Sequence, residues 1–461
     1  MGKVFLLATN TTTDPYPVYP LGMAVVAKAL VSAGHEVRQF DFLSSGRDTV
    51  ALERAIRDFA PDCVGLSLRN IDNVDSFCGE SGWYLAQARE LTDICRAASG
   101  GGASVVVGGP AFSIMPEEIL DYLGADFGVV GEGEKAFPEL VARLARGETP
   151  ERIIRSAGPG LTGRDMAAPL LVREFVDFYV GGSGMVNLQT KRGCPFRCVY
   201  CTYPHIEGRV LRLREPEAVV DDLARMSRDF GVDHVFFTDS VFNDPGGHYL
   251  EVAEALVRSG LNVKWSAFFK PMPITAEELA LLKRAGLYAV ELGTDAACDA
   301  TLAGLDKSFD FAQALAFNQA CVAQEIPVAH FVMFGGPGET MGTVREGLAN
   351  LDRLENCVVF AFSGIRILPG ARMLDIARQD GLLADGAPLL KPVYYFSPRV
   401  DIPAMHEAMQ ASFAGRRGRI FPPSEGQARM EVMQRFGYRG LMWDKLISFR
   451  QSKPRVRRAK A

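Results

Sequence analysis

The sequence from residue 191 to residue 204 reads Lys-Arg-Gly-Cys-Pro-Phe-Arg-Cys-Val-Tyr-Cys-Thr-Tyr-Pro. It places Cys194, Cys198 and Cys201 in a C-x3-C-x2-C pattern on one short segment. Three thiolates on such a loop can bind three irons of a [4Fe–4S] cluster and leave the fourth iron without a protein ligand. An iron without a protein ligand is free to bind a second molecule. We therefore predict that these three cysteines are metal ligands at a catalytic centre.

A zinc site is the alternative interpretation of the same loop. His205 follows Cys201 by four residues and could complete a Cys3His tetrahedron. The other cysteines are scattered and form no second motif: Cys63, Cys78, Cys95, Cys298, Cys321 and Cys357. An odd total of nine cysteines with one metal motif favours a protein of the reducing cytoplasm over a disulfide scaffold.

The cysteine pattern resembles that of the radical S-adenosylmethionine (SAM) enzymes. The resemblance implies that the open iron binds the amino and carboxylate groups of SAM. One electron then cleaves SAM to a 5′-deoxyadenosyl radical, which implies an electron donor such as flavodoxin or ferredoxin. Tyr200 matches the aromatic residue that this family places before the third cysteine, and we expect it beside the adenine.

The length and composition are those of an ordinary multidomain globular protein. A chain of 461 residues is long enough for two or three domains. Its net charge of -5 argues against generic nucleic-acid binding, so we expect no nucleic-acid partner. We find no signal peptide and no apolar run near the roughly 20 residues of a membrane span. The basic segment 453–460 is expected to be a solvated terminus.

Residues 1–150 alternate short apolar runs with helical stretches, which predicts a flavodoxin-like (Rossmann-type) α/β domain. The predicted strands are Val4–Ala8, Glu36–Phe42, Cys63–Leu68, Ser104–Val107 and Phe127–Val130. The predicted helices are Gly22–Ala33, Val50–Phe59, Ser81–Ala98, Glu117–Leu123 and Ala136–Arg146. Ligands of such sheets bind beyond the carboxyl ends of the strands, so we expect a binding site there.

Three segments of this domain resemble the cobalamin-binding domain of one branch of the radical SAM family. They are Tyr19-Pro20-Leu21-Gly22-Met23, Gly108-Gly109-Pro110 and Gly131-Glu132-Gly133-Glu134. The resemblance implies cobalamin as a further cofactor. The residues that it assigns to cobalamin are Thr12, Arg69, Asn70, Gly108, Gly109, Glu132 and Gly133.

The loop of residues 10–22 contains no histidine, so cobalamin would lack the protein imidazole that binds cobalt in many other proteins. Arg69 could face the lower side of the corrin instead. A guanidinium cannot serve as a metal ligand at ordinary pH, so it would disfavour a lower axial donor and ease reduction of the cobalt. The alternative is that Arg69 pairs with Asp72 or Glu80 at the surface.

Residues 185–390, which follow a linker of residues 151–184, again alternate strands and helices. The predicted strands are Val186–Thr190, His234–Thr238, Val263–Phe268, Ala289–Leu292, Val328–Phe334 and Ser363–Ile367. The predicted helices are Pro216–Asp229, Gly247–Arg258, Ala276–Arg284, Phe309–Gln324, Thr340–Leu354 and Arg372–Gln379. Six such units with the cysteine loop after the first strand resemble the partial (β/α)6 TIM-like barrel of radical SAM enzymes.

Barrel sites lie at the carboxyl ends of strands, and several strand ends here resemble the SAM contacts of the family. The resemblance implies that Asp239 and Ser240 lie near the aminoacyl group of SAM. Glu291 would accept the ribose hydroxyls, and Thr294 would contact the carboxylate, although Asp295 replaces the serine often found at that position. The remaining implied contacts are Gly336 near adenine, and Arg366 facing the aminoacyl carboxylate or the substrate. Glu339 and Thr340 have a second interpretation as the start of a helix.

Residues 391–461 are predicted to be mainly helical. Residues 392–396 would form one more strand or a flap on the substrate side. A set of soft apolar residues would pack a core or, alternatively, line a pocket for an apolar substrate. These residues are Met405, Met409, Phe413, Met430, Met433, Phe436 and Met442.

The combined resemblance implies a cobalamin-dependent radical SAM enzyme that methylates an unactivated carbon of a biosynthetic intermediate. Methylcobalamin and the 5′-deoxyadenosyl radical would act together on a small-molecule, lipid or peptide substrate. One alternative is a related cyclase or rearrangement enzyme that transfers no methyl group. Less favoured alternatives are a tRNA methylthiotransferase, whose second cysteine triad is poorly matched here, and a non-catalytic metal or corrinoid binder.

Overall fold

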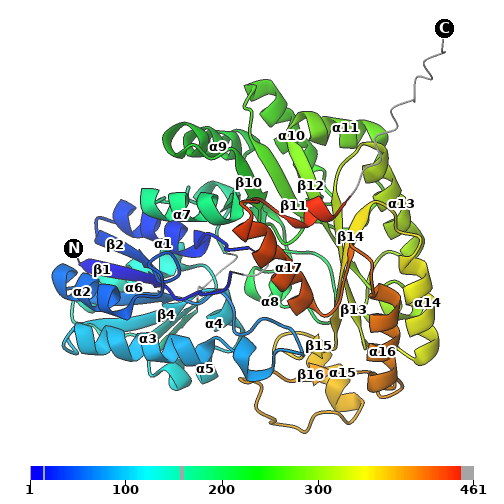
Figure 1. Cartoon of the computed structure of the whole chain (residues 1–461). Helices are drawn as coiled ribbons and strands as arrows, with labels where there is room; N and C mark the ends of the chain where they lie inside the picture. Colours follow the sequence, from blue (N-terminus) through cyan, green and yellow to red (C-terminus); the bar gives the residue numbers. More distant parts are fainter. Residues whose placement is uncertain (1, 14–15, 156–159, 448–461) are drawn as a thin grey trace.

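The computed structural model describes residues 2–13, 16–155 and 160–447, which form two α/β units (Figure 1). The first unit lies to the left in that view and the second, larger unit lies to the right. The basic segment 453–460 is outside the described residues. None of the described helices is both long and apolar enough to cross a membrane.

The first unit is built on six parallel strands in the order β2-β1-β3-β4-β5-β6. The strands are β1 (Lys3–Ala8), β2 (Glu36–Asp41), β3 (Cys63–Ser67), β4 (Ser104–Gly108), β5 (Phe127–Val130) and β6 (Ile153–Arg155). The helices are α1 (Leu21–Ser32), α2 (Thr49–Phe59), α3 (Leu85–Ala98), α4 (Pro110–Ile114), α5 (Pro116–Leu123) and α6 (Gly133–Ala145), with a 3-10 turn η1 (Gly79–Gly82). Helix α1 packs with α6 and α2 packs with α3. The order of the first five strands confirms the flavodoxin-like prediction.

Local sequence signals explain these boundaries. Asp48 caps α2 by accepting a hydrogen bond from the Ala51 amide at 2.9 Å. Gly124 ends α5 in the left-handed conformation, with φ of 66°. Two short elements are additional to the prediction. They are α4, which begins at Pro110, and β6, which extends the sheet into the stretch predicted as a linker.

The second unit is a partial barrel of seven parallel strands in the order β17-β14-β13-β12-β11-β10-β7. Its strands are β7 (Val186–Leu188), β10 (His234–Phe237), β11 (Lys264–Phe269), β12 (Leu287–Asp295), β13 (Val328–Phe334), β14 (Cys357–Ser363) and β17 (Arg419–Ile420). Its main helices are α7 (Arg173–Ser183), α9 (Pro216–Phe230), α10 (His248–Ser259), α11 (Ala276–Arg284), α12 (Asp299–Gly304), α13 (Phe311–Ala323) and α14 (Met341–Leu351). The first six strands, β7 and β10 to β14, confirm the predicted (β/α)6 barrel.

The predicted sixth strand, Ser363–Ile367, is wrong in its boundaries. The sixth barrel strand is β14, which ends at Ser363 because Gly364 turns the chain with φ of 74°. A side chain at that position would also collide with the Phe396 ring, 2.6 Å from the position of its Cβ. The chain then forms β15 (Ile365–Arg366), which pairs antiparallel with β16 (Tyr394–Tyr395). Residues 392–396 therefore contribute a strand.

The C-terminal segment is mainly helical, as predicted. It contains α16 (Ile402–Phe413), α17 (Pro423–Arg435) and a 3-10 turn η3 (Trp443–Leu446), after the shorter α15 (Met373–Gln379). Strand β17, which the prediction omitted, adds a seventh parallel strand beside β14. Most of the predicted soft apolar residues are buried, namely Met405, Met409, Phe413, Met430 and Met442. Met433 is partly buried, and Phe436 is exposed over 79% of its surface.

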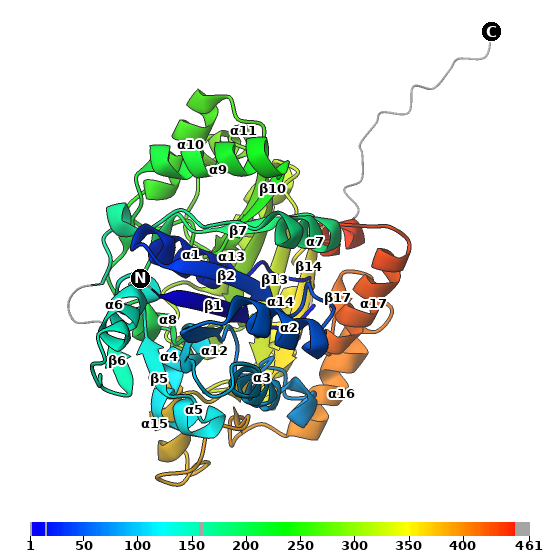
Figure 2. The same cartoon turned by 90° about the vertical axis from the view of Figure 1, so that its left-hand side faces the viewer.

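The two units meet through the loop that carries the cysteines. This loop contains β8 (Lys191–Arg192), the short helix α8 (Tyr203–Ile206) and β9 (Arg212–Leu213), which pairs antiparallel with β8. Helix α8 lies against α4 of the first unit. Figure 2 looks from the side of the first unit and shows the barrel strands behind it. The cysteine loop is thus placed at the junction between the two sheets.

Candidate active site

A cavity of about 610 Å³ lies where the two units meet. The first unit lines it with the loops that follow β1, β3, β4 and β5, and the barrel lines it from β7, β10 and β11. Six of the predicted cobalamin residues line this cavity: Arg69, Asn70, Gly108, Gly109, Glu132 and Gly133. The barrel side contributes Asn187, Gln189, Thr238 and Phe268. Both sheets therefore present the carboxyl ends of their strands to one space.

Glycines allow the backbone to approach this cavity closely. Gly109 has φ of 101°, and a Cβ there would lie 2.4 Å from the Leu68 carbonyl oxygen. Gly65, within β3, would place a Cβ 2.7 Å from side-chain atoms of both Leu6 and Phe137. The cavity also has an apolar wall. That wall includes Leu6, Val25, Val26, Val106, Val129 and Phe137.

Three buried polar atoms, two of them on residues that line the cavity, have no hydrogen-bond partner among the described residues. They are Arg69 Nη1, Asn10 Nδ2 and Thr12 Oγ1. A buried polar group without a partner is unfavourable, so these atoms fit a large polar ligand that supplies the missing hydrogen bonds. Thr12 follows the cavity-lining Asn10 in the same loop. A cobalamin site therefore fits the residues that are present.

The Arg69 guanidinium is held without a carboxylate partner in the described part of the chain. Burial is the largest influence on the pKa of Arg69 and lowers it. Asp72, one of the two predicted partners, instead accepts a hydrogen bond from Arg366 Nε at 2.8 Å. The side chain of Glu80, the other predicted partner, is outside the described residues. The arginine therefore faces the cavity, and its predicted pairing with Asp72 is not formed.

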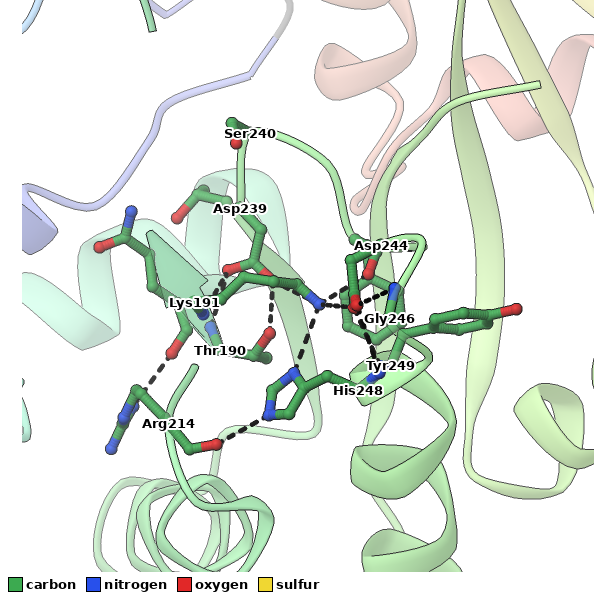
Figure 3. Close-up of polar contacts among 12 residues, drawn as sticks. Thr190, Lys191, Arg214, Asp239, Ser240, Asp244, Gly246, His248 and Tyr249 are labelled. Carbon is green, nitrogen blue, oxygen red and sulfur yellow. Dashed lines mark hydrogen bonds and ion pairs between the residues drawn. The ribbon is translucent and has the colours of Figure 1, made fainter. Parts of the chain in front are cut away.

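A buried polar network holds the strand that leads into the cysteine loop (Figure 3). Lys191 is fully buried, and its Nζ donates to Asp244 Oδ1 at 2.8 Å and to the Phe242 carbonyl at 2.7 Å. His248 Nε2 lies 2.7 Å from the Arg214 carbonyl oxygen. Beyond Lys191 and Arg192, Gly193 turns the chain with φ of 94°, where a Cβ would lie 2.2 Å from the Val210 carbonyl oxygen. The loop therefore begins from a rigid base.

Asp239 and Ser240 contact this loop directly. Both Asp239 carboxylate oxygens accept hydrogen bonds from Thr190, at 2.7 Å from its amide and 2.5 Å from its hydroxyl. Asp239 is completely buried and positions the strand before the cysteine loop, and its place near SAM stays a prediction. Ser240 Oγ donates to the Gly193 carbonyl at 2.7 Å and remains partly accessible. A SAM contact by Ser240 stays a prediction.

A second network joins the cysteine loop to the first unit. Arg192 donates to Glu132 at 2.8 Å and to Glu134 at 2.6 Å. Arg212 Nη1 donates to the other Glu132 oxygen at 2.6 Å, and the Leu161 amide does so at 2.8 Å. These partners outweigh the effect of burial and hold the pKa of Glu132 below its usual value. Sequence reasoning assigned Glu132 to cobalamin and missed the two arginines, which come from a distant part of the chain.

Lysines that sequence reasoning also missed lie beside the cysteines. Lys307 Nζ is 3.1 Å from Cys198 Sγ, 3.1 Å from the Tyr200 hydroxyl, and forms an ion pair with Asp295. The Tyr200 hydroxyl donates to Asp295 Oδ1 at 2.8 Å. Lys270 Nζ lies 3.3 Å from the centre of the Phe196 ring. No motif could have indicated these contacts, because both lysines follow strands or helices that are remote from the loop in sequence.

The donor set of the loop fits an iron–sulfur cluster. Burial raises the pKa of Cys194, and it raises that of Cys201 to about 12, so the free thiols are protonated. Neighbouring lysines oppose this effect and would favour the thiolates that bind metal. Among the described residues, no three His, Cys, Asp or Glu side chains converge as on one metal ion. A [4Fe–4S] cluster needs no such convergence, because each thiolate binds a different iron.

Three residues predicted to contact SAM are buried and already have protein partners. Thr294 Oγ1 lies 2.8 Å from His330 Nδ1, where burial lowers the pKa of the histidine to about 3. Arg366 donates to Asp72 of the first unit and to the Leu389 carbonyl at 2.8 Å. Glu291 Oε1 accepts hydrogen bonds from the Tyr16 hydroxyl and Trp443 Nε1, both at 3.2 Å. The structure does not bring these three residues together, and their contacts to SAM stay predictions.

The glycine-rich segment after β13 behaves as a close-packed turn. Gly335 has φ of 89°, and a Cβ there would lie 2.9 Å from the Phe396 ring, whereas a Cβ on Gly336 would lie 3.3 Å from Ile365 Cδ1. Thr340 caps α14 by accepting a hydrogen bond from the Thr343 amide at 3.3 Å. Glu339 is buried and accepts a hydrogen bond from the Gly335 amide at 2.8 Å. Thr340 is therefore the N-cap of α14, as the helix interpretation predicted, whereas Glu339 lies one residue before the cap and outside the first turn.

Comparisons with known proteins agree with this arrangement. Residues 8–141 match the family model of the B12 binding domain, and residues 188–349 match that of the radical SAM superfamily. The chain is 26% identical to tryptophan 2-C-methyltransferase of Streptomyces laurentii, over 80% of this chain and 73% of that protein. It is 27% identical to hopanoid C-3 methylase of Methylococcus capsulatus, over 60% of this chain and 53% of that protein.

Solved structures share the fold over nearly the whole chain. The methyltransferase TsrM from Kitasatospora setae, with tryptophan and a SAM analogue bound, is 24% identical with a TM-score of 0.83. The match covers 96% of this chain and 97% of that one. OxsB, with cobalamin and SAM bound, is 17% identical with a TM-score of 0.71, over 95% of this chain and 71% of that one.

Glu291 generates a prediction about stability and pH. Burial raises its pKa from 4.5 to about 7, so between these values the folded protein holds a proton that the unfolded chain releases. Stability should therefore fall as the pH rises through this window, by up to about 3 kcal/mol at 1.36 kcal/mol per pKa unit. Glu291→Gln should remove that fall in urea unfolding measured from about pH 5 to about pH 8. The exposed control Glu90→Gln should retain it, and an equal slope in wild type and Glu291→Gln would contradict the prediction.

Proposed function

Because this chain is a cobalamin-binding-domain radical SAM enzyme related to C-methyltransferases, we propose that it methylates an unactivated carbon of a small biosynthetic intermediate. Its cofactors are cobalamin, a [4Fe–4S] cluster and SAM. When bound, the cluster with SAM supplies radical chemistry, and cobalamin carries the methyl group. The main support for the proposal is that the strand ends of both sheets line the same cavity.

The proposal gives each group of residues a task. Cys194, Cys198 and Cys201 would hold the cluster, and the Tyr200 ring would lie beside the adenine of SAM. Arg69, Asn70 and the glycines of residues 108, 109 and 133 would hold cobalamin, since they line the cavity on the side of the first unit. Asp239 and Arg192 position the cysteine loop between them. The chain thus supplies binding, orientation and shielding from water.

The barrel wall supports a substrate with an apolar or aromatic face. Phe268 lines the cavity and has 38% of its surface exposed. Phe236 packs edge-on against it, with the two ring centres 4.9 Å apart. Aromatic rings favour flat or apolar groups and bind them with defined geometry. We infer that the substrate enters on this side of the cavity, opposite the loops of the first unit.

The function is tested by cofactor content and by a labelled methyl group. After purification without oxygen, the wild type should contain about four irons and one corrinoid per chain, whereas Cys198→Ala should lose iron and keep the corrinoid. The loaded enzyme should then transfer a deuterated methyl group from SAM to a compound in an extract of small metabolites. Zinc in place of iron would contradict the enzyme assignment. A new product without the label would favour a ring-forming reaction.

Arg69 should govern the redox behaviour of the bound cobalt. Its buried cation would stabilise the reduced, more negative form, so Arg69→Ala should move the cobalt reduction potential to more negative values. Arg69→Lys, which keeps the charge, should remain closer to wild type. The measurement is a potentiometric titration followed by the absorbance of the bound corrinoid, at matched corrinoid content. Equal potentials in wild type and Arg69→Ala would contradict the assignment.

An electron donor such as flavodoxin or ferredoxin completes the proposal, and a basic surface supports its binding. Pro195, Arg197, Arg209 and Arg372 line a surface hollow of about 400 Å³ over the cysteine loop. Arg372 fixes the loop by donating to the Arg197 carbonyl at 2.5 Å. Asp306 forms ion pairs with both Arg372 and Arg197, so the hollow keeps an excess of positive charge that includes Arg209. The chain as a whole carries a net charge of -5, so this local excess would direct an acidic partner to the cluster loop.

Reversing the charge of Arg209 should slow reduction of the cluster by a protein donor and leave its reduction by a small reductant unchanged. Arg209 is exposed, and Arg209→Glu should lower the second-order rate of reduction by reduced flavodoxin several-fold at low salt. Reduction by dithionite should not change, because a small chemical reductant does not need the docking surface. Arg57→Glu, an exposed arginine on α2, is the matched control. A loss with dithionite as great as that with flavodoxin would refute the docking surface.

A further inference from the structure

A buried lysine and a buried carboxylate stand beside one cysteine of the predicted cluster loop. Lys307, which follows α12, places Nζ 3.1 Å from Cys198 Sγ and 3.1 Å from the Tyr200 hydroxyl. Its ion-pair partner is Asp295, the last residue of β12. The two side chains are 6% and 12% exposed, so water screens their charges poorly.

The chain holds Asp295 in this position at an energetic cost. Its backbone has φ of 60°, in the left-handed region that residues other than glycine seldom adopt, and the ladder between β12 and β13 is irregular just before it. Asp295 also stands where the resemblance to the family leads us to expect serine. A buried carboxylate at this site is unfavourable unless a cation pairs with it, and Lys307 supplies that cation.

The hydrogen-bond directions leave one lysine proton for the sulfur. The Tyr200 hydroxyl donates its proton to Asp295 Oδ1 at 2.8 Å. The oxygen of this hydroxyl is therefore free to accept a hydrogen bond from Lys307 Nζ. An ammonium has three protons, and the three neighbours are the carboxylate, the phenol oxygen and Cys198 Sγ. Each proton of Lys307 thus has an acceptor, and Cys198 is the acceptor that would bind iron.

We propose that Lys307, held by Asp295, donates a charge-assisted hydrogen bond to the Cys198 thiolate and raises the reduction potential of the cluster. The inference rests on the cluster proposed above. Reduction adds one electron, delivered by a protein or chemical reductant, and makes the cluster more negative. A cation bonded to a cluster sulfur stabilises that form, and hydrogen bonds to the sulfurs are an established control of cluster potential. Asp295 opposes part of this effect with its own negative charge.

The two charged partners should therefore have opposite effects on the potential. Lys307→Met removes the positive charge and should lower the midpoint potential by at least 59 mV, the equivalent of a tenfold change for a one-electron couple. Asp295→Asn is nearly isosteric, removes the negative charge while keeping one acceptor oxygen, and should raise the potential. Lys307→Arg keeps the charge and should stay closer to wild type than Lys307→Met does.

The measurement is a redox titration of the whole chain with its cluster, followed by electron paramagnetic resonance of the reduced state. Lys264→Met, at the amino end of β11 and thus at the other end of the barrel, is the control and should not shift the potential. Shifts of the same sign in Lys307→Met and Asp295→Asn, or no shift at wild-type iron content, would overturn the proposal. If Lys307→Met fails to retain iron, Asp295→Asn still decides it, because a potential equal to or below that of the wild type would overturn the proposal. A wild type without iron would instead refute the proposed function itself.

Discussion

The Arg192 guanidinium joins the two halves of this molecule, and the position of the cysteine loop depends on it. It contacts Glu132 and Glu134, which follow β5 of the first unit, and it stands two residues before Cys194. Each of the three side chains is at most 12% exposed. Removing one member of such a buried set would leave an unpaired charge in a poorly solvated place. The loops that line the cavity and the cysteine loop are therefore held at fixed positions relative to each other.

Contacts between residues far apart in the sequence also hold the two units together. Asp72 of the first unit binds Arg366 from the end of the barrel, with both side chains almost fully buried. Glu291 inside the barrel binds Tyr16 from the first unit and Trp443 from the C-terminal segment. Glu291 and Arg366 were expected to contact SAM, and in this fold they also connect distant segments. These buried contacts stabilise the walls of the cavity.

Motifs with local meaning could be predicted well. The spacing of Cys194, Cys198 and Cys201 indicated the cluster loop, and alternating apolar runs indicated two parallel sheets, both of which the structure contains. Boundaries that depend on packing could not be predicted. Strand β14 ends where Gly364 meets the Phe396 ring, and the two-residue strand β17 exists only because β14 offers an open edge. Neither feature has a signal in its own segment.

The sequence by itself determined which chemistry this protein carries, because three cysteines on one loop and a set of glycine turns are properties of short segments. Only the tertiary structure decided which polar residues serve that chemistry and which hold the fold. Asp239 turned out to support Thr190, and Lys307 turned out to stand beside Cys198. The physical reason is that the role of a charged side chain depends on the partners and the water around it. Burial sets both, and burial arises only when distant segments pack together.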